Sequence, residues 1–153
     1  MKAIVSHISP STGSIKWLLL FTLLAIGTMS FKTSRDKLIL NIGNVEQQGT
    51  LYVSFYRNPA EWADNGTYTF KFSASAAGKN TYEIDTIPLG TYAVALFQDL
   101  NGNGELDTNF FGIPKEPYAF SNDVTPKLSA PSFEKCQFQF QQDNQVVSIH
   151  LLN

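Results

Sequence analysis

The chain has 153 residues, a formal net charge of −2 and one cysteine. This length indicates a single domain, and one cysteine excludes an internal disulfide, so the domain must fold without covalent staples. The mildly acidic balance, without basic clusters, argues against nucleic acid and against anionic membrane surfaces as partners.

The first 30 residues are typical of an export signal rather than of a folded domain. Lys2 and Lys16 supply positive charge around the apolar run WLLLFTLLAIGTM. That run is shorter than the roughly 20 residues of a membrane span but suits the apolar region of a signal peptide. We therefore expect residues 1–30 to be a signal peptide and residues 31–153 to be one exported domain. The alternative is that the segment stays uncleaved as an N-terminal anchor, which would be the only link to a membrane.

Several short runs after the signal segment alternate apolar and polar residues, which is the two-residue period of half-buried strands. KLILNIG (37–43) and LYVSFYRN (51–58) are the first two. Next, NPAEWADN (58–65) has a proline suited to the first turn of a short helix. YTFKFSA (68–74) and TYEIDTI (81–87) are expected to form a hairpin, because a Gly and an Asn lie between them.

The run TYAVALFQ (91–98) is apolar on both faces, so we expect a central strand that is covered on both sides. FEKCQFQF (133–140) and QVVSIHLL (145–152) are expected to pair as a closing hairpin. In this arrangement Cys136 is a buried apolar residue rather than a reactive thiol, and His150 is solvated. About seven strands at these intervals predict an all-β fold, a two-sheet antiparallel β-sandwich that is immunoglobulin-like or prealbumin-like.

The connection from Asp99 to Ser132 has little strand pattern and should form one long ordered loop. Connections beyond about 12–15 residues are usually functional or disordered, and the aromatic residues of this one favour order. Four aromatic side chains are candidate contacts for a ligand, the alternative being that they form the core of the loop itself: Phe110, Phe111, Tyr118 and Phe120.

The connection opens with DLNGNGELD, which matches the first nine positions of an EF-hand-type calcium loop. Ca²⁺ takes six to eight oxygen ligands, and alternate residues of a tight loop turn their side chains inward. Gly104 stands where such a loop turns sharply. The spacing predicts a calcium site with a dissociation constant of roughly 10⁻⁴–10⁻³ M. Its ligands would be Asp99, Asn101, Asn103, Glu105 (through its backbone carbonyl) and Asp107.

The match is incomplete, because Phe110 stands at the twelfth position, where a bidentate Glu is expected. Glu116 and Asp123 are the candidates to complete the shell. Transition metals are disfavoured, because no His or Cys lies nearby. Two alternatives remain open: the run is a series of Asx-turns that binds no ion, or Asp107 and Glu116 are the paired carboxylates of a hydrolase.

Several motifs occur in a characteristic order along the chain. They are GTYA at 90–93, the run DLNGNGELD, GIPKE at 112–116, FSN at 120–122 and PSF at 131–133, preceded by the strand and turn GTLYVSFYRNPAEW. In this combination the chain resembles the uncharacterised exported bacterial proteins that contain domain of unknown function 2141. That family often has a His just before the first Asp, where this chain has Gln98, so no role of that His carries over.

The resemblance implies an exported β-sandwich with an ordered loop, located in the periplasm, on the cell surface or outside a bacterium. It implies no activity. We therefore expect a non-enzymatic envelope module whose calcium-stabilised loop shapes a recognition surface for an unknown envelope or extracellular ligand or protein. The hydrolase remains the alternative, and a structural or adhesive role at the cell surface is a third possibility.

Overall fold

The computed structural model describes residues 35–46, 48–62, 66–74, 80–127 and 129–153. The expected signal peptide lies outside this part of the chain, so its prediction stands as made. No helix within the described ranges has the length and apolarity to cross a bilayer. The elements described are β1 (Leu38–Gly43), β2 (Thr50–Tyr56), α2 (Pro59–Trp62), β3 (Tyr68–Ser73), β4 (Thr81–Ile84), β5 (Gly90–Asp99), β6 (Tyr118–Phe120), η1 (Ser121–Asp123), α3 (Phe133–Cys136), β7 (Phe138–Phe140) and β8 (Gln145–His150).

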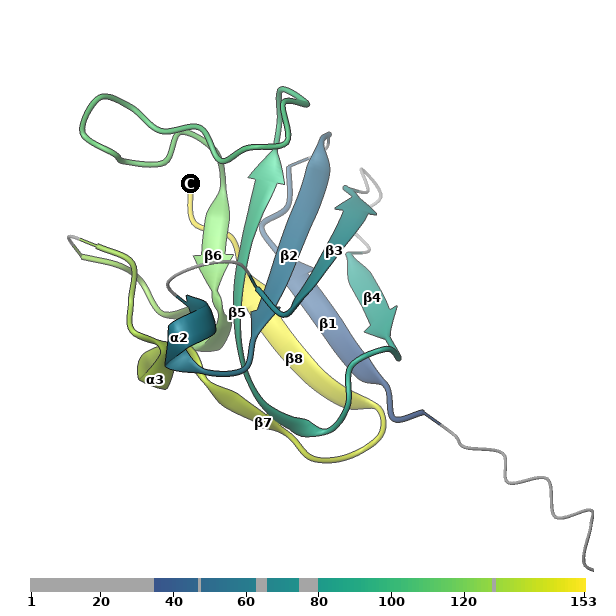
Figure 1. The fold of residues 1–153 in the computed structure, drawn as a ribbon. Helices are drawn as coiled ribbons and strands as arrows, with labels where there is room; N and C mark the ends of the chain where they lie inside the picture. The colour runs from purple at the N-terminus through teal and green to yellow at the C-terminus, as the bar shows by residue number, and fades with distance from the viewer. Residues whose placement is uncertain (1–34, 47, 63–65, 75–79, 128) are drawn as a thin grey trace, which may run out of the picture. The chain divides into compact units, whose positions relative to one another are not determined.

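The strands form two sheets that face each other, so the predicted β-sandwich is confirmed (Figure 1). One sheet has the order β4-β1-β8, and the other has the order β3-β2-β5-β6, with β7 also paired to β5. All these pairs are antiparallel except one, since β1 and β8 run parallel. The expectation of a purely antiparallel sandwich is therefore wrong at the β1–β8 pair.

The core lies between the inner faces of the two sheets. Burial alternates along β1 and β2, as their two-residue period predicts. Completely buried side chains on the two strands include Leu38, Leu40, Leu51, Val53 and Phe55. Burying one such side chain contributes about 1.5–3 kcal/mol. These alternating runs therefore decide which face of each sheet points inward.

Strand β5 is the central strand, and both of its faces are covered, as predicted from its sequence. Tyr92 and Val94 point into the core between the sheets. Ala93 points the other way and packs with Phe133 and Cys136 of α3. The short helix α2, which the sequence also predicted, covers the same outer face (Figure 1). A second, smaller apolar cluster therefore lies outside the sandwich and supports β5 from behind.

Neither predicted hairpin forms. Strand β3 pairs with β2, and β4 pairs with β1 in the opposite sheet. Instead of sharing a ladder, β3 and β4 contact each other through the rings of Phe72 and Tyr82, which stack with centroids 4.1 Å apart. At the end of the chain, β7 pairs with β5 while β8 pairs with β1. In both cases consecutive strands pair with different neighbours and belong to different sheets.

Two further segments differ from the sequence expectation. Residues 133–136 form the helical turn α3 rather than a strand, closed by the N–H of Gln137 donating to the carbonyl of Phe133 at 2.9 Å. Phe133 and Cys136 are three residues apart, so one helix face buries both. The connection after Asp99 also has regular structure of its own, because it contains the short strand β6 and the 3₁₀ turn η1.

Candidate functional site

The acidic loop, residues 99–107, leaves the end of β5 and closes on the carboxylate of Asp99. This side chain is 2% exposed. Its Oδ1 accepts the N–H of Gly102 at 2.7 Å, and its Oδ2 accepts the N–H of Gly104 at 2.8 Å. The two glycines have φ values of 80° and 81°, a left-handed conformation that costs other residues about 1–2 kcal/mol. They allow the backbone to wrap around one carboxylate.

The two asparagine side chains of the acidic loop converge on Asp107. The amide Nδ2 atoms of Asn101 and Asn103 lie 2.5 and 3.3 Å from its Oδ2. The Oδ1 atom of Asn101 accepts the N–H of Asn103, and that of Asn103 accepts the N–H of Glu105. These are two successive Asx-turns. The structure thus brings three of the predicted calcium ligands together through their side chains. Glu105 takes part through its N–H, whereas its carbonyl was the predicted ligand.

Glu116 closes the base of the acidic loop. It is 6% exposed, and its two oxygens accept backbone N–H bonds from Leu100 at 2.8 Å and from Asp107 at 3.1 Å. The N–H of Lys115 adds a bond to the carbonyl of Asp107 at 2.8 Å. Hydrogen bonds to an ionised carboxylate are roughly twice as strong as neutral ones. Glu116 therefore ties both ends of the loop to the segment that returns to β6.

Asp123, the other candidate for completing a metal shell, contacts a different element. Its Oδ1 accepts the N–H of His150 at 2.8 Å, and its Oδ2 lies 2.9 Å from Nδ1 of the same residue. His150 is exposed, as expected, but its pairing with Asp123 was not predicted. Within the described residues, no group of three or more His, Cys, Asp and Glu side chains is arranged to hold a metal.

Residues 108–114, which we call the flap, follow the acidic loop and fold back on themselves. Oδ1 of Asn109 accepts the N–H groups of Phe111 at 2.9 Å and of Ile113 at 3.1 Å. The backbone of Asn109 exchanges further bonds with Ile113 and Gly112. One asparagine thus closes the whole turn. Sequence reasoning missed Asn109, although the neighbouring glycine is a turn signal.

The flap turns its apolar side chains outward. Phe110 is 97% exposed, Phe111 83% and Ile113 58%, and the two phenylalanine rings contact each other edge to face at 5.5 Å. Tyr118 and Phe120 on β6 are half-buried, and Phe120 packs near Trp62. The alternative that these aromatics form the core of the loop is therefore wrong for Phe110 and Phe111.

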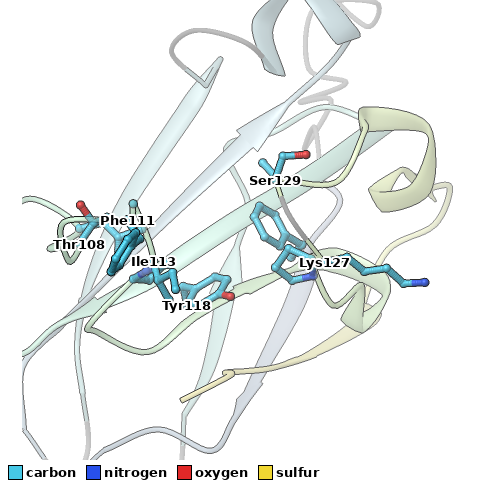
Figure 2. Close-up of a pocket in the computed structure, with 12 residues that line it drawn as sticks. Thr108, Phe111, Ile113, Tyr118, Lys127 and Ser129 are labelled. Carbon is cyan, nitrogen blue, oxygen red and sulfur yellow. The ribbon is translucent and has the colours of Figure 1, made fainter.

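A groove of about 330 Å³ lies beside the flap. Figure 2 shows Phe111 and Ile113 on one side of it, Ser129 on the other, and Tyr118 between them. The lining is mainly apolar and aromatic. Among the described residues that line the groove, Lys127 is the only one that carries a charge, and its side chain extends outward from the rim (Figure 2). The groove and the flap therefore share one apolar surface.

Gln98, the position at which the resembled family often has a His, is fully buried and serves as a clamp. Its Oε1 accepts the N–H of Glu46 at 2.9 Å, and its Nε2 donates to the carbonyls of Glu46 and Gln48 at 3.0 and 2.6 Å. All three bonds tie β5 to the chain between β1 and β2. The residue next to Asp99 thus has a structural role in this chain.

Cys136 is fully buried, as predicted. Burial disfavours the thiolate and raises the pKa of its thiol to about 11. A thiol with this pKa is a poor nucleophile at neutral pH. The cysteine is therefore part of the apolar cluster behind β5.

Two facing sheets, the acidic loop and the flap define the molecule as a β-sandwich domain with one elaborated connection. A family model described as "Uncharacterized protein conserved in bacteria (DUF2141)" matches residues 41–148. The chain belongs to this bacterial family, and the resemblance drawn from its motifs is confirmed. No curated protein and no solved structure matches the chain. The matched range includes the acidic loop, the flap and the groove.

Proposed function

We propose that the domain is a non-enzymatic binding module that works in the periplasm, on the cell surface or outside the cell. It recognises an envelope or extracellular ligand or protein through the flap and the groove. The observation that carries the proposal is the exposure of Phe111 and Ile113 on a turn whose N–H groups are already bonded to Asn109. Clustered exposed apolar side chains mark binding surfaces, and a surface ordered in advance loses little conformational entropy on binding.

The acidic loop positions that surface, and calcium is its proposed stabiliser. Asn101, Asn103 and Asp107 already converge on one point. The Oδ1 atom of each asparagine accepts one backbone N–H and keeps a second lone pair for a cation. Asp99 and the backbone carbonyl of Glu105 would complete the set. Oxygen ligands of this kind are those that Ca²⁺ prefers. Calcium bound here would stiffen the base from which the flap extends.

The hydrolase alternative receives less support from the carboxylates. A general acid must reach the substrate with its proton, but both oxygens of Glu116 accept backbone N–H groups and the residue is 6% exposed. Asp107 accepts both neighbouring asparagine amides. Neither residue is among those that line the groove. The two carboxylates are better explained as the frame of the loop.

Retention of the full chain on isolated cell-envelope preparations tests the proposal. Removal of an aromatic anchor typically costs 2 kcal/mol or more, so Phe111→Ser should weaken retention at least about tenfold while leaving the melting temperature unchanged. Val146→Ser is the matched control, because Val146 is a 56% exposed apolar residue on β8 in the other sheet. Equal retention of both variants, or turnover of an envelope substrate, would refute the binding-module reading.

A further inference from the structure

The groove beside the flap points to a definite class of ligand. We infer that it takes a small amphipathic carboxylate, a molecule with a compact apolar or aromatic body and one carboxylate group. The inference rests on the proposed function, because it names the ligand class of the same surface. It draws on the groove's size, on its apolar lining and on its single charge.

The apolar part of the ligand follows from the lining. Phe111 and Ile113 form one side and Tyr118 lies between the two sides (Figure 2), so three apolar or aromatic side chains face the space. A volume of about 330 Å³ is at the lower end of the range for small-molecule sites, roughly 300–1,000 Å³. The groove is thus large enough for a small apolar body.

The carboxylate follows from charge complementarity. Lys127 is the only charged side chain among the described residues of the lining, and within the described part of the chain no ion pair joins it to a carboxylate. Its ammonium group extends outward in Figure 2, but its flexible four-carbon stem lets it swing over the mouth of the groove. Ser129, on the same segment, adds a hydroxyl donor. An anionic group at the mouth would meet these donors while its apolar body lies inside.

Two neighbouring phenylalanines distinguish binding of this ligand from binding to a lipid surface. Phe111 lines the groove, whereas the more exposed Phe110 does not. A bilayer would engage both rings and would engage Phe110 at least as strongly. Of the two phenylalanines, a ligand inside the groove contacts only Phe111. Phe110→Ala is therefore the matched control for Phe111→Ala.

Calorimetric titration of the full chain with octanoate, octan-1-ol and octylammonium tests the inference, because the three probes share one apolar chain and differ in charge. Octanoate should bind at least about tenfold more tightly than octan-1-ol, which corresponds to 1.4 kcal/mol, and octylammonium should bind most weakly. Phe111→Ala should weaken octanoate at least about tenfold, and Phe110→Ala should change it less than about twofold. Lys127→Gln should lower octanoate to the level of octan-1-ol, whereas Lys127→Arg should preserve the preference.

Several outcomes would overturn the inference. They are equal binding of octanoate and octan-1-ol, an unchanged preference in Lys127→Gln, and an equal loss in Phe110→Ala accompanied by binding to phosphatidylcholine vesicles. Binding of an apolar peptide but not of octanoate would also overturn it. If octanoate fails to bind but Phe111→Ser still abolishes retention on envelope preparations, the ligand class is wrong and the binding module stands. If both experiments fail, the proposed function fails with it.

Discussion

Glu116 accepts the backbone N–H of Leu100 at 2.8 Å across 16 residues of chain. The other oxygen of the same carboxylate accepts the N–H of Asp107, so one buried side chain fastens both ends of the acidic loop. The flap begins directly after this loop. Its orientation therefore depends on a carboxylate that sequence reasoning placed in a metal shell or an active site.

Glu116→Ala should destabilise the domain by about 2–4 kcal/mol, because it leaves two backbone N–H groups without charged acceptors. Glu116→Gln should also be destabilising, since the amide nitrogen meets one of those N–H groups. Urea denaturation measures both. Glu105→Ala is the control, because its exposed side chain should change the free energy of unfolding by less than about 0.5 kcal/mol. A loss in Glu116→Ala no larger than in this control would contradict the clamp.

Gly102 and Gly104 have nearly the same φ but different surroundings, so their alanine variants should differ. Both should lose about 1–2 kcal/mol from the left-handed backbone. A Cβ on Gly104 would also lie 3.2 Å from the hydroxyl oxygen of Tyr52, whereas one on Gly102 meets no atom within 4 Å. Gly104→Ala should therefore cost more in urea denaturation. The excess should vanish in a Tyr52→Phe background, and a larger cost at Gly102 would count against this geometry.

Calcium should raise the melting temperature of the full chain, and magnesium should not. At a calcium concentration tenfold above the dissociation constant, binding contributes about 1.4 kcal/mol, or a rise of roughly 5 °C. Asp107→Asn should abolish the rise. Asp123→Asn should preserve it, because Asp123 is paired with His150. No rise at millimolar calcium in the unaltered chain would leave the loop as a series of Asx-turns.

The buried thiol of Cys136 should make stability depend on pH above neutrality. Because its pKa is raised from 9.0 to about 11 in the folded state, the folded chain holds the proton more tightly than the unfolded chain. The stabilisation is complete below pH 9 and is lost as the pH rises towards 11. Burial also raises the pKa of Tyr92, so the Cys136 contribution is isolated by comparison with Cys136→Ala. The variant should show a shallower loss of unfolding free energy between pH 8 and 10, and identical slopes would argue against the shift.

Much of the fold was readable from the sequence. The two-residue period identified β1 and β2, because burial on one face fixes which residues point inward. The run that is apolar on both faces identified β5 as the central strand. The sequence did not predict which strands pair with each other. The turn residues between β3 and β4 predicted a hairpin, but β3 pairs with β2 and β4 pairs with β1. These pairings depend on packing between segments that are distant in the sequence.

The candidate site was predictable in position more than in detail. The spacing of Asp99, Asn101, Asn103 and Asp107 indicated a tight loop, and the structure shows one. The exposure of Phe110 could not be read from its identity, because an aromatic side chain beside a long loop is equally suited to a core. The turn that Asn109 closes directs the Phe110 side chain outward. The hydrogen bonds of Asn109 span only a few residues, but they form only when the chain folds back at this point.

Amide hydrogen exchange in the free protein tests most directly whether the flap is ordered before any ligand binds. The N–H groups of Phe111 and Ile113 donate to Oδ1 of Asn109, so they should exchange at least about 100-fold more slowly than in an unstructured peptide. Asn109→Ala should remove that protection while leaving the amides of β5 protected. Exchange of both flap amides at the unstructured rate in the unaltered chain would contradict a preformed recognition surface.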